Sequence, residues 1–570
     1  MSEPALKGTA GSLIAATLHA YQVTHVFGMA DPVHVFHALD RRTIQPVTVR
    51  DEKHGAIMAH GYAKATGRPG VCAATTGPGA TNLVTGLFEA SKSSVPLIAL
   101  VQETPARLVG KHAASEVDQA AALAPVSKWI GRIVDAAKAA ETVRAAFRAA
   151  TSGRPGPAVV LCPADVMGQT AEVPVYAEPG CERAPAFRSR ASRESIATAA
   201  TLLAGARRPV IVAGGGCILS QAWREVVGLA EEYGIPVATT MTGRGTIPDA
   251  HPLSVGVLGS STGGRHGGGR IANRVLAESD LAVIIGSRTG QIVTSDWTLP
   301  RPGTKVIHLD MDPLETGRNI RTTVAMIGDA RETLVDLLEH CREQKIRPKI
   351  ETTSVYLGSL KAELAGLTEP LATSTAVPIH PERLLREISR VVDARTLIAA
   401  DASYITGWAL SHVENVGQGC TFISPRGTGG LGWGLPAAIG AKLADPTRTV
   451  MCLTGDGGFG YVMNELETAA RYRAKVLTVV FNNGTLAFQK HYEEKLFGEA
   501  IECDLLDVDY SEVARALKCG GERVTHPDQI GAALQRGIAA EGPYLVDVVI
   551  DPRAKAPIVS LESPGDVSAH

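Results

Sequence analysis

The sequence has few of the features that mark secreted, membrane-bound or nucleic-acid-binding proteins. Its nine cysteines stand singly, with no C-x-x-C pair and an odd total, so neither a disulfide framework nor a structural zinc site is expected. It has 56 basic and 58 acidic residues, a net charge of −2, which provides no positive surface for nucleic acid or an anionic membrane. The N-terminal stretch is neither basic nor followed by a long apolar run, so we expect no signal peptide and a cytoplasmic location.

Long apolar runs are also missing. Residues 69–88 carry no charge, but their glycine, proline, threonine and asparagine content argues against a membrane span. At 570 residues the chain is too long for one hydrophobic core, and about three domains are expected.

Three segments alternate short apolar runs with helical patterns, which is typical of α/β domains with parallel sheets. They cover residues 1–175, 190–345 and 375–555. The Pro-, Ala- and Arg-rich stretch 171–190 is interpreted as a linker, and the residues from Pro552 onward as a tail. The sequence therefore predicts an α/β protein with three doubly wound parallel-sheet domains.

The stretch from Gly455, GDGGFGYVMNELETAARYRAKVLTVVFNN, has the G-x-G-x-x-G spacing of a phosphate-binding loop. Its second residue, however, is Asp456, whose carboxylate would repel a bound diphosphate. A divalent cation between the two anions removes this conflict, and Mg²⁺ is the cation that takes such oxygen ligands together with phosphate.

The pattern around this loop predicts a strand, a helix of about fourteen residues and a second strand. The helix is indicated by Phe459, Met463, Leu466 and Ala470, which fall at helical spacing. Asp456 and Asn483 then both lie at the carboxyl ends of parallel strands, where open α/β sheets bind ligands.

Other interpretations of these residues compete. An Asp at a helix start is usually a cap, and an Asn pair after a strand is usually a turn. A dinucleotide site would need an acidic residue at the end of the second strand, where this chain has Asn482 and Asn483.

The GDGG and FNN elements resemble the cofactor motif of thiamine diphosphate enzymes. This resemblance implies Mg²⁺ held by Asp456, Asn483 and the backbone oxygen of Thr485. The resemblance covers nearly the whole chain, and the sequence is similar to that of the catalytic subunits of acetolactate synthases. It includes RDEKHGAIMAHGYAKATGRPGVCAATTGPGATNLVTGL of the pyrimidine-binding domain, PVIVAGGGC of the central domain and GGLGWGLPAAIGA before the diphosphate-binding motif.

In this family an acidic residue precedes the GYA element by nine positions, and Glu52 stands nine residues before Gly61. A carboxyl group bonded to the cofactor's aminopyrimidine ring favours the imino tautomer, whose nitrogen can take the proton of the thiazolium carbon. Glu52 is therefore the candidate catalytic carboxylate. Without the other motifs, a solvated glutamate would be the simpler interpretation.

The resemblance implies further cofactor contacts. Leu431 aligns with the bulky apolar residue that bends the cofactor, although ordinary core packing would explain a lone leucine equally well. The remaining candidates are Pro78, Asn82, Ala402, Ser403, Tyr404, Gly429, Gly455, Gly457, Gly458 and Leu486.

Four residues align with family positions near the reaction centre: Gln102, Lys128, Arg288 and Tyr492. Gln102 and Lys128 are candidate catalytic residues, and Gln102, Arg288 and Tyr492 are candidate substrate contacts. Arg288 is suited to an acceptor carboxylate, but each cation can equally be a surface residue.

Several positions depart from the family pattern. Ala114 and Ser115 replace a Phe-Gln pair, which removes a large ring and can admit a bulkier substrate. Tyr492 replaces a tryptophan, and Ile405 stands where a histidine is expected. These departures concern the donor and acceptor substrates.

The central segment is a candidate FAD site. Gly214–Gly216, with Ser287 and Arg288, partly fit the family's flavin-binding pattern, whereas its Met-His-Gly element is replaced by GSST. The Gly-rich stretch 260–270 can cradle a phosphate, but a mobile surface loop is the favoured interpretation.

The resemblance implies an enzyme that decarboxylates a 2-oxo acid such as pyruvate and joins the fragment to a second carbonyl compound. Alternatives are a decarboxylase or carboligase with another substrate, such as the sulfoacetaldehyde acetyltransferase type, and a non-catalytic nucleotide-binding homologue. Because Glu52 and Asp456 lie in different domains and the family shares its site between two chains, a homodimer or homotetramer is expected.

Overall fold

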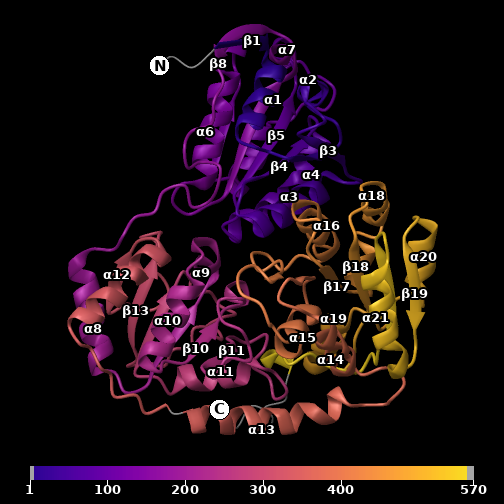
Figure 1. Ribbon diagram of the computed structural model, residues 1–570. Helices are drawn as coiled ribbons and strands as arrows, with labels where there is room; N and C mark the ends of the chain where they lie inside the picture. The colour runs from indigo at the N-terminus through magenta and orange to yellow at the C-terminus, as the bar shows by residue number, and fades with distance from the viewer. Residues whose placement is uncertain (1–4, 353, 562–570) are drawn as a thin grey trace.

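The computed structural model describes residues 5–352 and 354–561. It contains three six-stranded sheets, one each in an N-terminal, a central and a C-terminal unit that form the corners of a triangle (Figure 1). All neighbouring strands in these sheets are parallel. The predicted fold class is confirmed. Within the described residues, none of the helices combines the length and the apolar character that crossing a bilayer requires.

The N-terminal unit has the strand order β3-β2-β4-β5-β7-β6. Its strands are β2 (His25–Gly28), β3 (Gln45–Thr48), β4 (Gly70–Ala74), β5 (Leu97–Glu103), β6 (Trp129–Arg132) and β7 (Pro157–Pro163). Its helices are α1 (Ala10–Ala20), α2 (Val33–Ala38), α3 (Glu52–Thr66), α4 (Pro78–Lys92), α5 (Gln119–Leu123), α6 (Ala139–Thr151) and α7 (Ala164–Met167). Strands β4 and β7 are buried along their whole length, as expected when helices cover both faces of a parallel sheet.

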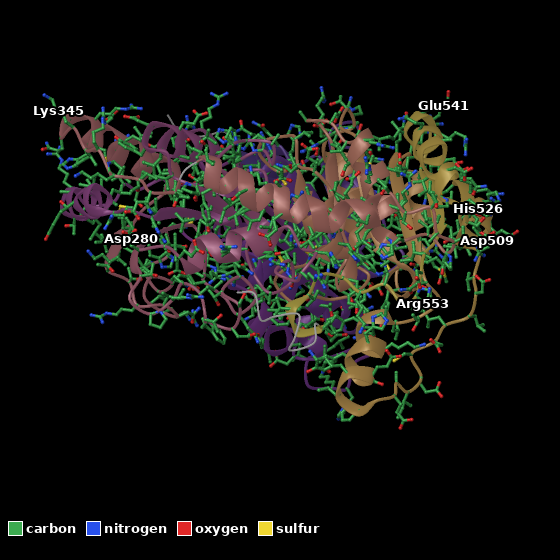
Figure 2. All side chains as sticks on the ribbon, turned by 90° about the horizontal axis from the view of Figure 1, so that it is seen from below. Asp280, Lys345, Asp509, His526, Glu541 and Arg553 are labelled. Atoms are coloured by element: carbon green, nitrogen blue, oxygen red, sulfur yellow. The ribbon has the colours of Figure 1, made fainter. Side chains whose placement is uncertain are left out.

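The central unit has the order β11-β10-β9-β12-β13-β14. Its strands are β9 (Pro209–Ala213), β10 (Val237–Thr239), β11 (Ser254–Val257), β12 (Leu281–Ile285), β13 (Lys305–Asp310) and β14 (Val324–Ile327). Its helices are α8 (Arg193–Gly205), α9 (Gly215–Ser220), α10 (Trp223–Tyr233), α11 (Gly269–Ala277) and α12 (Ala330–Glu343). Helix α13 (Ser354–Ala372) then runs along the lower side of the molecule toward the C-terminal unit (Figures 1 and 2).

The C-terminal unit has the order β16-β15-β17-β18-β20-β19. Its strands are β15 (Leu397–Ala400), β16 (Phe422–Ile423), β17 (Val450–Gly455), β18 (Val476–Asn482), β19 (Gly520–Val524) and β20 (Tyr544–Val549). Its helices are α14 (Pro381–Val391), α15 (Tyr404–His412), α16 (Gly434–Ala444), α17 (Asp456–Gly460), α18 (Glu465–Arg471), α19 (Ala487–Phe497), α20 (Tyr510–Ala516) and α21 (Ile530–Ala539).

Two sequence-based expectations, one for the predicted linker and one for the helix after the GDG motif, need correction. Strand β1 (Ala5–Thr9) pairs antiparallel with β8 (Thr170–Pro174), so the predicted linker 171–190 begins as a strand. The expected single helix after the GDG motif is divided into α17 and α18, because the glycines of α17 are poor helix formers. Met463 lies between the two helices and is 39% exposed rather than facing the core.

The Gly-rich stretch 260–270 is not a surface loop. The chain after β20 lies against it: Gly264 N donates to Pro557 O at 3.1 Å, and Val559 N donates to Ser260 O at 2.9 Å. Five of its eleven residues are buried, and only Arg265 is exposed. The predicted tail is therefore packed as far as Leu561, and its last residues, 562–570, lie outside the described part.

Helices α3 and α16 form the contact between the N-terminal and C-terminal units (Figure 1). Their backbones approach so closely that a Cβ atom added at Gly61 would lie 2.0 Å from Ala437 O. One added at Gly440 would lie 1.9 Å from Met58 O. Only glycine fits at these two positions, because a backbone oxygen cannot move aside as a flexible side chain can.

This contact predicts a specific loss of stability. Gly440→Ala should lower the free energy of unfolding by about 2 kcal/mol or more, since the added methyl group forces the two helices apart. Gly358→Ala is the control, because Gly358 lies on exposed α13 with open space around it and alanine there should stabilise by about 0.5–1 kcal/mol. Thermal unfolding measures both. Equal midpoints for the two variants would contradict the close packing.

Candidate active site

The carboxylate of Asp456 lies at the carboxyl end of β17, in the first turn of α17. Its Oδ1 accepts a hydrogen bond from Gly457 N at 2.8 Å, and its Oδ2 accepts from Asn483 N at 3.2 Å and Gly484 N at 2.7 Å. Burial raises the pKa of Asp456, and the three backbone N–H groups oppose that shift. The side chain is thus a buried carboxyl group with little solvent to stabilise its charged form.

Asn483 and Thr485 follow β18, the strand beside β17, and lie in the same corner as Asp456. The register pairs Gly455 with Phe481, which brings the two strand ends level. The Asn483 Oδ1 accepts from Thr485 N at 3.2 Å. The predicted trio of Asp456, Asn483 and Thr485 is thus brought together, with oxygen atoms on all three residues.

Residues of the neighbouring strand end complete this corner. Ser403 begins α15 with φ 67° and ψ −143°, a conformation that a residue with a side chain rarely adopts. A cavity in this corner is lined by eleven predicted cofactor residues: Ala402, Ser403, Tyr404, Leu431, Gly455, Asp456, Gly457, Gly458, Asn483, Thr485 and Leu486. Gly429, which has φ 69°, lies outside that lining.

Asp401 was missed by sequence reasoning, although it directly follows the apolar strand β15. It is fully buried, and its carboxylate accepts hydrogen bonds from Ala402 N at 2.7 Å, from Trp433 N at 3.2 Å and from Thr454 Oγ1 at 3.0 Å. It therefore ties together three chain segments that line the corner. An acidic residue at the end of a buried strand was the available signal.

Glu52 begins α3 in the N-terminal unit and is 6% exposed. Its Oε2 accepts from Asn82 Nδ2 at 3.0 Å. Its Oε1 lies so close to Gly79 that a Cβ atom there would be 2.9 Å away. Pro78 is the first residue of the same helix, α4, so the predicted residues Glu52, Pro78 and Asn82 lie together.

Gln102 lies at the end of β5, near the start of α4. Its backbone oxygen accepts from Gln119 Nε2 at 2.9 Å, and the Gln119 Oε1 accepts from Gly77 N at 3.1 Å. Gln119 is buried, was not predicted and fixes the end of β5 against the α4 turn. Ser115, one of the residues that depart from the family pattern, packs against Gly77 in the same place.

Lys128 and Tyr492 lie apart from these residues. The Lys128 Nζ donates to Ser152 O at 2.6 Å, and burial lowers its pKa. Within the described residues its contacts do not include Glu52 or Gln102. Tyr492 is 42% exposed and stacks on Phe488, with ring centroids 6.1 Å apart.

Within the described residues, no hydrogen bond or ion pair joins Glu52 to the Asp456 corner. The cavity beside Asp456 is lined only by residues of the C-terminal unit. One copy of the chain thus carries two separate groups of site residues.

Comparison with known proteins relates both groups to one family. Residues 8–122 match the N-terminal TPP binding domain of thiamine pyrophosphate enzymes, 196–337 match the central domain, and 401–548 match the C-terminal TPP binding domain. The chain belongs to the thiamine pyrophosphate enzyme family.

Relatives of this enzyme cover nearly its whole length. A probable acetolactate synthase large subunit from Methanocaldococcus jannaschii is 35% identical over 96% of this chain and 92% of the relative. An acetolactate synthase from Arthrospira platensis is 33% identical over 93% of this chain and 92% of the relative. Glyoxylate carboligase from Escherichia coli O157:H7 is 31% identical over 93% of this chain and 90% of the relative.

The cofactor of this thiamine pyrophosphate enzyme is thiamine diphosphate, and the Asp456 corner fits its diphosphate end. A Cβ atom at Gly457 would lie 2.6 Å from Leu486 Cδ2, and one at Gly458 would lie 2.7 Å from Asp401 Oδ2. Glycines here keep the backbone open to a phosphate group, as in other phosphate-binding loops.

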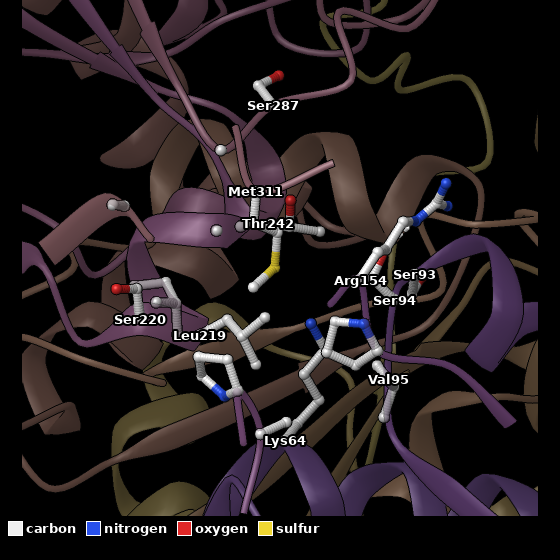
Figure 3. Close-up of a pocket in the computed structure, with 18 of the residues that line it drawn as sticks. Lys64, Ser93, Ser94, Val95, Arg154, Leu219, Ser220, Thr242, Ser287 and Met311 are labelled. Atoms are coloured by element: carbon white, nitrogen blue, oxygen red, sulfur yellow. Dashed lines mark hydrogen bonds between the residues drawn. The ribbon is translucent and has the colours of Figure 1, made fainter. Parts of the chain in front are cut away.

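A second, larger cavity of about 1120 Å³ lies where the three units of the enzyme meet. Lys64, Val95 and Arg154 approach it from the N-terminal unit, and Ser220, Thr242, Ser287 and Met311 approach it from the central unit (Figure 3). Arg288 lines this cavity and not the Asp456 corner, and burial lowers its pKa.

The role of Asp401 can be tested. Asp401→Asn replaces one carboxylate oxygen by an amide group that donates. Oδ1 accepts from Ala402 N and Trp433 N, and Oδ2 accepts from Gly432 N and Thr454 Oγ1, so one of these two pairs of donors loses its acceptor. We expect the dissociation constant of thiamine diphosphate to rise about tenfold, measured by calorimetry. The control is Asp445→Asn, on the same unit, where the side chain is only partly buried and bonds to Thr447 alone within the described residues. Equal affinities in the two variants would contradict the role of Asp401.

Proposed function

We propose that the enzyme decarboxylates a 2-oxo acid such as pyruvate and joins the resulting fragment to a second carbonyl compound, as an acetolactate synthase does. The observation that carries the proposal is the pair of separate site groups: a buried carboxylate, Glu52, beside α4, and the oxygen-rich corner at Asp456. The relatives named above as acetolactate synthases support the same reaction.

When bound, thiamine diphosphate supplies a carbon nucleophile and an electron sink for the decarboxylation. Glu52 exchanges a proton with the aminopyrimidine end of the cofactor. Asn82 holds Glu52 Oε2 in place at 3.0 Å, and Gly79 leaves space beside Oε1. Leu431 lines the corner and would supply an apolar contact to the bound cofactor.

We assign Mg²⁺ to the Asp456 corner. Asp456, the amide oxygen of Asn483 and the backbone oxygen of Thr485 supply three oxygen ligands, and this chemistry suits Mg²⁺. A cation there also neutralises a carboxylate whose pKa is raised by burial.

The magnesium assignment predicts a pH dependence. Only the ionised carboxylate of Asp456 binds a cation. Because burial raises the pKa of Asp456, lowering the pH should weaken cofactor binding at a higher pH than it would with an exposed aspartate. Asp456→Asn should raise the dissociation constant of thiamine diphosphate about a hundredfold and remove the effect of added Mg²⁺. Calorimetry with and without Mg²⁺ measures this. Asp507→Asn, at an 81% exposed side chain, is the control, and magnesium dependence retained in Asp456→Asn would refute the assignment.

We propose that Gln102, Lys128, Arg288 and Tyr492 act on the substrates. Gln102 has the most direct support, since it ends the strand beside the α4 turn that holds Glu52. Small residues at Ala114 and Ser115 leave room for a larger substrate. The 31% identity to a glyoxylate carboligase keeps a carboligase with another substrate as a second candidate.

Turnover tests the function directly. With pyruvate and cofactor, the enzyme should release carbon dioxide and form an acetolactate product. Glu52→Gln should leave cofactor affinity nearly unchanged while slowing proton exchange at the reactive carbon about a hundredfold or more. Glu172→Gln, on exposed β8, should exchange at the wild-type rate. Unchanged exchange in Glu52→Gln would favour a non-catalytic homologue, and turnover of glyoxylate or sulfoacetaldehyde but not pyruvate would favour the second candidate.

We propose that the active enzyme is a homodimer, or a tetramer built from such dimers. One copy holds Glu52 and Asp456 in separate groups, so a complete site requires residues from two copies. Apolar side chains near the corner support an interface: Tyr461 is 58% exposed, Phe497 76% and Leu506 85%.

Mixed dimers distinguish a shared site from a site within one chain. A Glu52→Gln chain paired with an Asp456→Asn chain has one intact site only if each site takes residues from both copies. Such hybrids should show roughly half of the wild-type turnover, and each parent almost none. Inactive hybrids that are dimeric by ultracentrifugation would contradict the shared site.

We propose FAD as an additional ligand of the 1120 Å³ cavity, which Gly215, Gly216, Ser287 and Arg288 line. The glycines also have a packing reason, because a Cβ atom at Gly216 would lie 2.6 Å from Gly286 Cα. A flavin absorption spectrum of the purified protein would support FAD, and a colourless protein that binds no added FAD would exclude it.

We propose domain limits at 1–175, 190–345 and 375–555, which limited proteolysis would check.

Nine free cysteines support a reducing compartment, the cytoplasm, which cell fractionation would check.

A further inference from the structure

Two buried glutamates, one from the N-terminal unit and one from the C-terminal unit, each accept hydrogen bonds from the other unit. Glu465 belongs to α18 of the C-terminal unit, and its partners lie in the N-terminal unit on both sides of Glu52. Glu89 belongs to α4 of the N-terminal unit, and its partners lie in the loop before Leu431. Neither residue belongs to the cofactor motifs.

Glu465 is 0% exposed. Its Oε1 accepts from Arg50 N at 2.9 Å and lies 2.8 Å from His54 Nδ1, while its Oε2 accepts from Thr468 Oγ1 at 2.6 Å. Arg50 and His54 are each two residues from Glu52. The carboxylate of Glu465 therefore holds the turn from which the catalytic carboxylate projects.

A second contact holds the same turn. Thr48, at the end of β3, donates its backbone N–H to the Tyr472 hydroxyl at 2.8 Å. Tyr472 is the residue that ends α18. The C-terminal unit thus satisfies two backbone donors, of Thr48 and Arg50, in the short segment that leads to Glu52.

Glu89 is 2% exposed. Its Oε1 accepts from Gly427 N at 2.8 Å, and its Oε2 accepts from Thr428 N at 2.7 Å and Thr428 Oγ1 at 2.7 Å. Ser93, one helical turn further along α4, also donates to Oε1. Lys64, Arg288 and Arg426 each interact electrostatically with the carboxylate. The loop that it holds leads through Gly429 to Leu431.

The arrangement is reciprocal. Helix α3 begins at Glu52 and α16 begins three residues after Leu431, and these two helices pack against each other. The loop before each helix is held by a glutamate from the opposite unit. Hydrogen bonds from N–H groups to a buried carboxylate are among the stronger ones in proteins, so both loops are fixed firmly.

We propose that Glu465 and Glu89 are positioning residues: Glu465 orients Glu52, and Glu89 orients the loop of Leu431. The inference rests on the proposed function, since it assumes that Glu52 and Leu431 act on the cofactor. In a homodimer with shared sites, each chain then links the aminopyrimidine end of one site to the diphosphate end of the other.

Glutamine variants test the proposal, because they keep the shape but replace an acceptor oxygen by a donor. Glu465→Gln should slow proton exchange at the cofactor's reactive carbon about tenfold at saturating cofactor, with the cofactor dissociation constant unchanged. Glu89→Gln should raise that dissociation constant about tenfold. A merely structural role would lower the unfolding midpoint without separating exchange from affinity.

Each matched control removes a hydroxyl group that donates to Glu465 or Glu89 from within its own unit. The hydrogen bonds between the two units stay in place. Thr468→Val should keep the exchange rate of the wild type, and Ser93→Ala should keep its cofactor affinity. Wild-type exchange in Glu465→Gln, or wild-type affinity in Glu89→Gln, would overturn the corresponding assignment. An absence of exchange in the wild-type protein would instead refute the proposed function.

Hydrogen–deuterium exchange of the wild-type protein tests the proposal even if the variants fail to fold. The amides of Arg50, Gly427 and Thr428 should exchange with deuterium far more slowly than that of exposed Glu499, which follows the end of α19, since each of the three donates to a buried carboxylate. Rapid exchange of these three amides in the wild-type protein would contradict the proposal.

Discussion

The packing of α3 on α16 is the contact on which the arrangement of the site depends. Two glycines let the helix backbones meet, with Gly61 against Ala437 and Gly440 against Met58. Each helix begins beside a candidate cofactor residue, so the contact fixes Glu52 relative to Leu431. It also buries apolar side chains of both units in one shared core.

Parallel sheets explain why the polar residues of each unit gather at one edge. In the C-terminal unit, β15, β17 and β18 end at Asp401, Asp456 and Asn483, which are far apart in sequence and adjacent in space. Two of these residues are buried aspartates whose pKa values are raised by burial. Such carboxylates destabilise a fold unless N–H groups or a cation satisfy them, and this corner supplies the N–H groups.

The separation of Glu52 from this corner gives the molecule its second constraint. Each chain carries two groups of candidate site residues that do not contact each other, and the proposed dimer would bring such groups from two copies together. Glu465 and Glu89 tie each group of candidate site residues to the opposite unit, which is the basis of their proposed positioning role. The contacts that pack the N-terminal unit on the C-terminal unit within one chain thus also hold residues of both proposed active sites.

Much of this was predictable from local sequence. The strand ends at Asp456 and Asn483 follow from the apolar runs on either side, and the GDG motif predicts a phosphate-binding turn between them. Asp401, which directly follows the apolar strand β15, could have been found in the same way. Gln119, Glu89 and Glu465 could not. Their partners are mostly backbone N–H groups of distant loops, 415 residues away for Glu465 and 338 for Glu89, and only the folded chain brings them together.

The most direct test is a crystal structure with thiamine diphosphate and Mn²⁺ in place of Mg²⁺. The account predicts an anomalous scattering peak bounded by Asp456, Asn483 and the Thr485 backbone oxygen, with the diphosphate on its other side. It also predicts Glu52 from a second copy beside the aminopyrimidine ring. A cofactor bound without a cation at Asp456, or bound wholly within one chain, would contradict it.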